Sequence, residues 1–78
     1  MKKWNYRVIY NPEDRSYGIH EVYYDSDGKP HLWSENCVSL QGESFQDLQR
    51  DFHLIQGAFS KPCLEISSVD NQDYLQEM

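Results

Sequence analysis

A chain of 78 residues with a formal net charge of −6 has room for one domain, which buries only about 60% of the surface that the unfolded chain exposes. Thirteen acidic side chains against seven basic ones disfavour a protein whose main partner is nucleic acid, because an acidic surface repels phosphates. Six Tyr, three Phe and two Trp are expected to do most of the packing.

Residues 1–3 lead directly into a strand-like run at Trp4, without the apolar stretch of a secretory signal. No segment approaches the roughly 20 apolar residues of a membrane span. The two cysteines, Cys37 and Cys63, are expected to be reduced and to behave as small buried hydrophobes. We therefore expect a cytoplasmic protein that does not bind membranes.

Residues 4–10 alternate as a half-buried strand does, and a polar loop connects them to a second strand over residues 17–24. One face of the first strand carries Trp4, Tyr6, Val8 and Tyr10, and the other carries Asn5, Arg7 and Ile9. The sequence leaves open which face a helix covers. If the aromatic face stays uncovered, a patch of that kind would mark a partner surface.

Asp27-Gly28 between two β-prone runs predicts a hairpin turn into a third strand over residues 31–37. A two- or four-residue loop would place Tyr24 opposite His31, Val22 opposite Trp33 and His20 opposite Glu35. A three-residue loop with a bulge would shift each of these pairs.

Ser44 is a good N-cap for a helix that we expect to end near Phe59 or Ser60. Apolar side chains then recur at spacings of three and four, which predicts a stripe that faces the sheet. The stripe consists of Phe45, Leu48, Phe52, Ile55 and Phe59, and Leu54 and Ala58 widen it.

The expected fold is α+β: a three-stranded antiparallel meander, one helix packed on one face, and a short fourth edge strand over residues 63–66, in the order β-β-β-α-β. Residues 1–66 form the single predicted domain. Residues 67–78 read as an acidic polar tail, either disordered or forming a short docking helix through Val69, Tyr74, Leu75 and Met78.

No cluster reaches the level of a catalytic, metal or cofactor signature, so we expect a protein that is not an enzyme and uses no cofactor. Asp25-Ser26-Asp27-Gly28 is similar to the start of a calcium loop, but Pro30 and Asn36 stand where an EF-hand needs Gly and Glu. The enzymatic alternative would use His20, Glu21 or His31, and it requires these groups to converge in a pocket.

A group of short bacterial proteins without an assigned activity resembles this chain at residues 6–9, residues 17–25, Asp27-Gly28 and residues 33–36. A looser resemblance joins Gly42-Glu43-Ser44-Phe45-Gln46-Asp47-Leu48 and the expected element order to HicB-like antitoxin domains. That resemblance implies a basic, toxin-like partner. The chain lacks the Pro-Asp-Leu-Pro-Gly-type segment that HicB-like proteins carry before the third strand.

These observations favour an interaction or regulatory module that associates with itself or with a basic protein, and they identify no small-molecule ligand. The candidate partner surface consists of Trp4, Tyr6, Tyr24 and Trp33. The alternative function is binding of single-stranded nucleic acid on the aromatic sheet residues, which would require nearby Lys or Arg.

Overall fold

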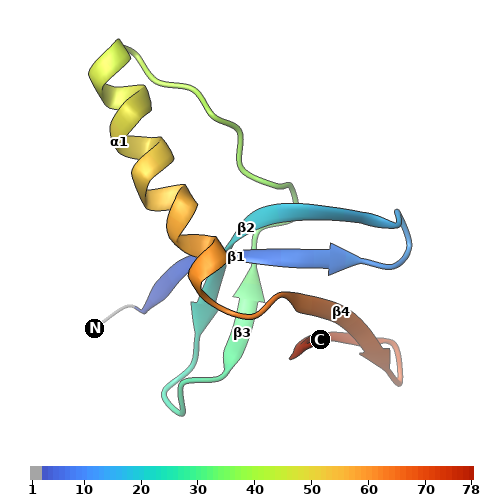
Figure 1. The fold of residues 1–78 in the computed structure, drawn as a ribbon. Helices are drawn as coiled ribbons and strands as arrows, with labels where there is room; N and C mark the ends of the chain where they lie inside the picture. The colour runs from blue at the N-terminus through green and yellow to red at the C-terminus, as the bar shows by residue number, and fades with distance from the viewer. Residues whose placement is uncertain (1–2) are drawn as a thin grey trace.

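The computed structural model describes residues 3–78 and shows an α+β protein with a five-stranded mixed sheet and one α-helix (Figure 1). In chain order, the strands are β1 (Trp4–Asn11), β2 (Ser16–Tyr24), β3 (Pro30–Trp33), β4 (Leu64–Val69) and β5 (Gln72–Glu77). The helix α1 spans Phe45–Gln56 and continues into a 3-10 turn, η1, over Gly57–Ser60. The strand order is β3-β2-β1-β4-β5, so the predicted antiparallel meander of the first three strands is present.

The β2–β3 register agrees only in part with the two alternatives drawn from the sequence. Val22 pairs with Trp33 as expected, but a bulge after Tyr23 places Tyr24 opposite Pro30 rather than His31. The expected pair of His20 with Glu35 is wrong, because β3 ends at Trp33. The His20 ring instead places its Nδ1 2.9 Å from the carbonyl oxygen of Ser34.

The β2–β3 turn depends on the carboxylate of Asp25, which accepts backbone hydrogen bonds from Asp27 at 2.9 Å and from Lys29 at 3.0 Å. Gly28 has a φ of 79°, a left-handed conformation that glycine adopts without strain. The hydrogen bond from Lys29 is the largest of the effects that hold the pKa of Asp25 below its ordinary value of 3.8. The turn therefore favours the ionised form.

Because the folded-state pKa of Asp25 is lowered, its contribution to stability is complete at neutral pH and is lost as the pH falls through that lowered pKa. In an NMR titration we expect the amide protons of Asp27 and Lys29 to shift with the same midpoint, below pH 3.8. Asp25→Asn keeps an acceptor oxygen and should remove this transition. A midpoint at or above 3.8 would contradict this account of the turn.

The predictions for the C-terminal third need two corrections. Leu64–Val69 is not an edge strand, because β4 lies parallel to β1 on one side and antiparallel to β5 on the other. The last twelve residues are neither a disordered tail nor a docking helix, since β5 occupies Gln72–Glu77. Asp70 and Asn71 both have positive φ, which is the geometry of a tight two-residue hairpin turn.

The core lies on the inner, concave side of a curved sheet, whose two edge strands β3 and β5 contact each other. Each of the four neighbouring strands β2, β1, β4 and β5 contributes one residue to its centre. Half-buried Tyr24, Trp33 and Ile66 pack against these residues. The central residues are Ile9, Val22, Leu64 and Leu75. Arg7 shares this inner side, is only 5% exposed, and donates to the Tyr24 hydroxyl at 2.8 Å and to the Pro62 carbonyl at 2.9 Å.

The helix does not cover the sheet, which is the main departure from the sequence prediction. Ser44 is the N-cap as expected, and its hydroxyl accepts from the Asp47 amide at 3.1 Å. Within Phe45–Gln56, however, Ile55 is the one buried residue, and the next buried position is Ala58 in η1. Only the C-terminal end of the helix is therefore anchored, and the rest rises away from the sheet (Figure 1).

This arrangement gives the molecule an extended shape. The radius of gyration is 13.4 Å, whereas a compact domain of this length has about 11.5 Å. The principal extents are 45 × 32 × 20 Å. The projecting helix and its connection account for the long dimension in Figure 1.

Candidate interaction surface

The projecting part of the molecule, which we call the arm, consists of residues 39–56. Its connection runs back along the helix, and a Cβ built on Gly42 would lie only 2.7 Å from the backbone nitrogen of Leu48. Any larger residue at position 42 would push the connection off the helix. The arm is therefore a two-layered projection rather than a bare helix.

Most of the expected stripe is open to solvent. We use the name apolar stripe for its exposed members, Phe45, Leu48, Phe52 and Phe59. The three phenylalanines are 73%, 50% and 69% exposed in chain order. Leu40 on the connection is also 53% exposed. The expectation that this stripe faces the sheet is wrong, since Ile55 alone of its five predicted members is buried.

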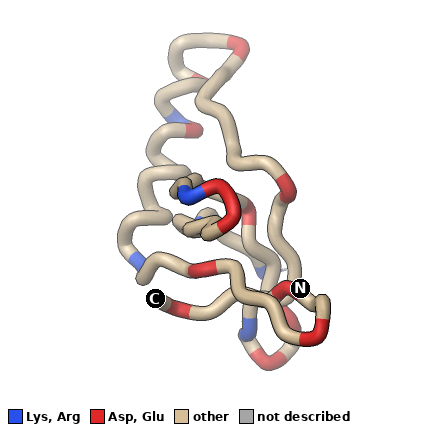
Figure 2. Tube along the Cα trace, turned by 90° about the vertical axis from the view of Figure 1, so that its right-hand side faces the viewer, with Lys and Arg blue, Asp and Glu red and all other residues tan. Residues whose placement is uncertain are grey.

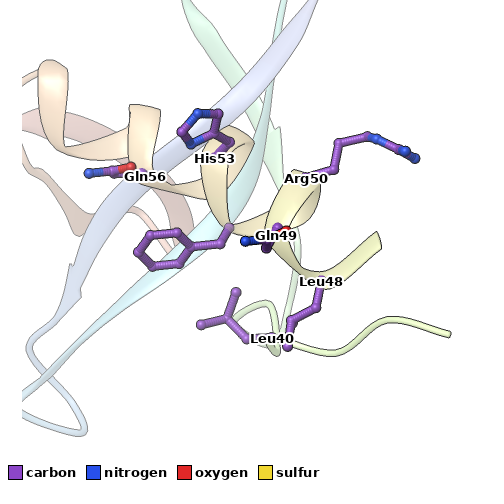
Figure 3. A pocket seen from close by; sticks show the side chains of 7 residues that line it. Leu40, Leu48, Gln49, Arg50, His53 and Gln56 are labelled. Atoms are coloured by element: carbon purple, nitrogen blue, oxygen red, sulfur yellow. The ribbon is translucent and has the colours of Figure 1, made fainter. Parts of the chain in front are cut away.

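An open hollow of about 660 Å³ lies between the connection and the helix. Its apolar residues are Leu40, Leu48 and Phe52, with polar side chains around them. Figure 3 shows Leu40 beside Leu48, while the Arg50 side chain points away from both. The hollow therefore forms part of the same apolar surface as the stripe.

A second hollow, of about 390 Å³, lies where the arm joins the sheet. It is lined by residues of β1, β2, α1, η1 and the connection, including Val8 and Ile19 of the sheet and Phe59 of η1. Val8 and Ile19 face the outer side of the sheet, opposite the core. The anchored end of the helix therefore lies on the outer face.

The outer face also holds aromatic residues, but its charges are acidic. Trp4 packs edge-on against Tyr6 at 5.2 Å between ring centroids. Burial raises the pKa of Tyr6, and the nearby charges of Glu21 and Asp51 raise it further. The hydrogen bond that Tyr23 donates to Glu21 raises the pKa of Tyr23 as well. Acidic side chains of both the sheet and the helix therefore act on this face.

The four residues of the predicted partner surface divide between the two sides of the sheet. Trp4, which is 43% exposed, and half-buried Tyr6 lie on the outer face. Tyr24 and Trp33 pack against the core on the inner side, where the Tyr24 hydroxyl donates to Asn5 at 2.8 Å. The sheet therefore presents no continuous platform built from all four.

Figure 2 shows the basic positions of residues 3–78 scattered along the chain between acidic ones. Arg7 is buried in the core, and Arg50 is engaged with Asp47 at 3.3 Å. The charges that act on half-buried Tyr6 are those of Glu21 and Asp51, rather than the Lys or Arg that nucleic-acid binding would require.

The three residues of the enzymatic alternative do not converge. His20 points to the inner side, as does its strand partner Arg7, whereas Glu21 points to the outer side beside Tyr23. His31 is exposed at the bulge of the edge strand β3. No pocket among those found in the described part of the chain brings the three together.

The cysteines differ in their surroundings. Cys37 is exposed, contrary to the expectation of a buried thiol, and shares a small hollow with His20 and Glu35. Cys63 is half-buried, and burial raises the pKa of its thiol. Among residues 3–78, no group of three or more His, Cys, Asp or Glu side chains is placed to hold a metal ion.

Comparison of the chain with models of protein families, with curated proteins and with solved structures found no match in any of the three. The resemblances named from the sequence stay predictions. Of the helices in residues 3–78, none has the length and apolar character needed to span a membrane.

Proposed function

We propose that the protein is a non-enzymatic interaction module that associates with a second copy of itself through the apolar stripe of α1 and η1. The observation that carries this proposal is the exposure of Phe45 and Phe52, 73% and 50%, on a helix that packs on the sheet only at its C-terminal end, together with Phe59, 69% exposed in the η1 turn that follows. Burying such side chains is the main favourable contribution to protein association.

The size of the surface supports an interaction. At roughly 200 Å² per phenylalanine, the three rings and the neighbouring leucines Leu40 and Leu48 expose on the order of 550 Å². This value lies at the upper end of the apolar patches found on typical monomers, about 300 to 600 Å². Two copies that covered each other would bury about 1,100 Å², above the roughly 1,000 Å² that a specific interface needs.

The test is the molar mass in solution by light scattering, over about 5 to about 500 µM protein, the range in which an interface of this modest size dissociates. We expect the mass to rise with concentration from 9.3 kDa to twice that value. High salt should leave the association intact, because apolar burial drives it. A mass of one chain throughout would overturn the proposal, and binding of a basic protein would then be the remaining form of interaction.

A further inference from the structure

We propose that Trp4, Tyr6 and Glu21, on the outer face of the sheet, bind the guanidinium group of an arginine side chain in a basic peptide. This site is separate from the apolar stripe and is complete within one chain. It therefore goes beyond the proposed self-association and does not depend on it. The strand register, the ring contacts and the charges around the rings support this assignment.

The β1–β2 register places the residues of the site side by side. Trp4 lies opposite Tyr23, and Tyr6 lies opposite Glu21, so all four side chains leave the same face of the sheet. Directly opposite residues have Cβ atoms about 4.5 to 5.5 Å apart, and diagonal neighbours such as Trp4 and Glu21 about 7 to 8 Å. A planar guanidinium fits this spacing, because it can stack on the ring while its N–H groups donate to the carboxylate.

The Trp4 ring is held in place by its neighbours and is still accessible. It contacts Tyr6 at an angle of 87° between the ring planes, with centroids 5.2 Å apart, and Tyr23 with centroids 6.1 Å apart. Nevertheless, 43% of Trp4 is exposed. Tryptophan is the aromatic residue that attracts cations most strongly. Because two rings already fix its orientation, binding costs little additional ordering of the side chain.

The carboxylates near these rings form no ion pair within residues 3–78, where the single pair lies elsewhere on the helix. Glu21 accepts a hydrogen bond from the Tyr23 hydroxyl, which holds its carboxylate on this face. A carboxylate has about four acceptor positions, so a guanidinium can still donate to it. After burial, the charges of Glu21 and of Asp51 on the helix are the causes that raise the pKa of Tyr6. The surroundings of the rings therefore favour a cation.

The exposure of the site favours the side chain of a peptide over a free small molecule. Ligand pockets cover about 70 to 90% of a small molecule, whereas Trp4 is 43% exposed on a sheet face. A side chain that belongs to a longer peptide gains further contacts beside the site, and the net charge of −6 attracts a basic chain. Arginine suits the site better than lysine, because a guanidinium stacks on aromatic rings and is less strongly hydrated than an ammonium.

The experiment is an NMR titration of the nitrogen-15-labelled protein, at constant ionic strength, with a short peptide that carries one arginine and is capped at both ends. The indole N–H signal of Trp4 should shift and saturate, whereas that of Trp33, which packs against the core, should not. The same peptide with citrulline in place of arginine keeps the shape without the charge and should give no saturable shift. Tetramethylammonium, which cannot donate to a carboxylate, should bind more weakly than the arginine peptide.

Three variants locate the binding. Trp4→Leu, followed through the backbone amide signal of Glu21, should weaken it about two- to fivefold, the loss of an exposed contact between a cation and a ring. Glu21→Gln should weaken it by up to about fivefold, because the amide keeps an acceptor for Tyr23 and loses the charge. Glu13→Gln removes the same charge from the exposed loop after β1 and should leave the affinity unchanged.

A Trp4 signal that does not respond to the arginine peptide, or that responds equally to the citrulline peptide, would overturn the site. An equal loss of affinity in Glu13→Gln and Glu21→Gln would show attraction by net charge alone and would overturn it as well. Tighter binding of tetramethylammonium would replace the arginine side chain with a free small cation. Since light scattering tests the apolar stripe and this titration tests Trp4, failure of either proposal leaves the other standing.

Discussion

Phe52→Ser is expected to abolish the dimer at concentrations where the wild-type protein is fully associated. Phe52 is 50% exposed in the free chain and lies at the centre of the apolar stripe. Losing a central aromatic anchor of an interface costs about 2 kcal/mol or more. Because a two-fold dimer contains this residue twice, we expect a loss of about 4 kcal/mol, or on the order of 1,000-fold in the dissociation constant.

Leu54→Ser is the matched control for this prediction. Leu54 is 59% exposed and, contrary to the expectation that it widens the stripe, lies about 200° around the helix axis from Phe52, on the side away from the stripe. Sedimentation equilibrium of both variants should show a monomer for Phe52→Ser and an unchanged dimer for Leu54→Ser. Circular dichroism should show that both keep the helix. Equal dimerisation of the two variants would show that the stripe is not the interface.

Arg7→Ala is expected to destabilise the fold by about 3 kcal/mol. The guanidinium of Arg7, on β1, donates hydrogen bonds to Tyr24 on β2 and to Pro62, which precedes β4. Hydrogen bonds from charged groups contribute about 1.5 to 3 kcal/mol each. The alanine also leaves a void where the buried aliphatic part of Arg7 packed. Relief of a buried charge offsets part of this loss, since among residues 3–78 the Arg7 Nε has no hydrogen-bond partner.

Urea unfolding measures the loss of unfolding free energy in Arg7→Ala. Two further variants show whether that loss comes from the hydrogen bonds of this guanidinium. Arg7→Lys keeps the charge but not the planar fork that serves two acceptors, so we expect an intermediate loss. Arg50→Ala removes an arginine whose side chain is 72% exposed and pairs with Asp47 on the surface, a change of about 0.5 kcal/mol or less. If Arg7→Ala unfolds within 0.5 kcal/mol of the wild-type protein, Arg7 does not hold the strands together.

Local features of this protein were predictable from the sequence, because short-range physical chemistry determines them. Ser44 caps the helix, and Asp27-Gly28 turns the chain between β2 and β3, since both depend on hydrogen bonds and backbone conformations within a few residues. Alternation defined β1 and β2. A local signal for β5 was also present in Asp70-Asn71, residues that tolerate positive φ, but the polar strand around it hid the pattern.

The sequence placed each phenylalanine of the candidate interaction surface on an apolar stripe. It did not predict that this stripe is exposed. The spacing of Phe45, Phe52 and Phe59 shows that this side of the helix needs an apolar cover, and it does not say whether the cover comes from the same chain. Tyr24 and Trp33, which were predicted to belong to the partner surface, instead pack half-buried against the core, because the sheet curves around that core.

The sequence by itself determined the helix with its cap, the first hairpins and the acidic, aromatic-rich character of a small α+β protein. Only the tertiary structure decided that Arg7 and Ile9 lie inside, that β5 completes the sheet, and that the helix stands off with its stripe exposed. These outcomes depend on contacts between distant segments, above all the edge strands that meet across the core and the anchoring of the helix at its C-terminal end alone. Periodicity along the chain carries no information about such contacts.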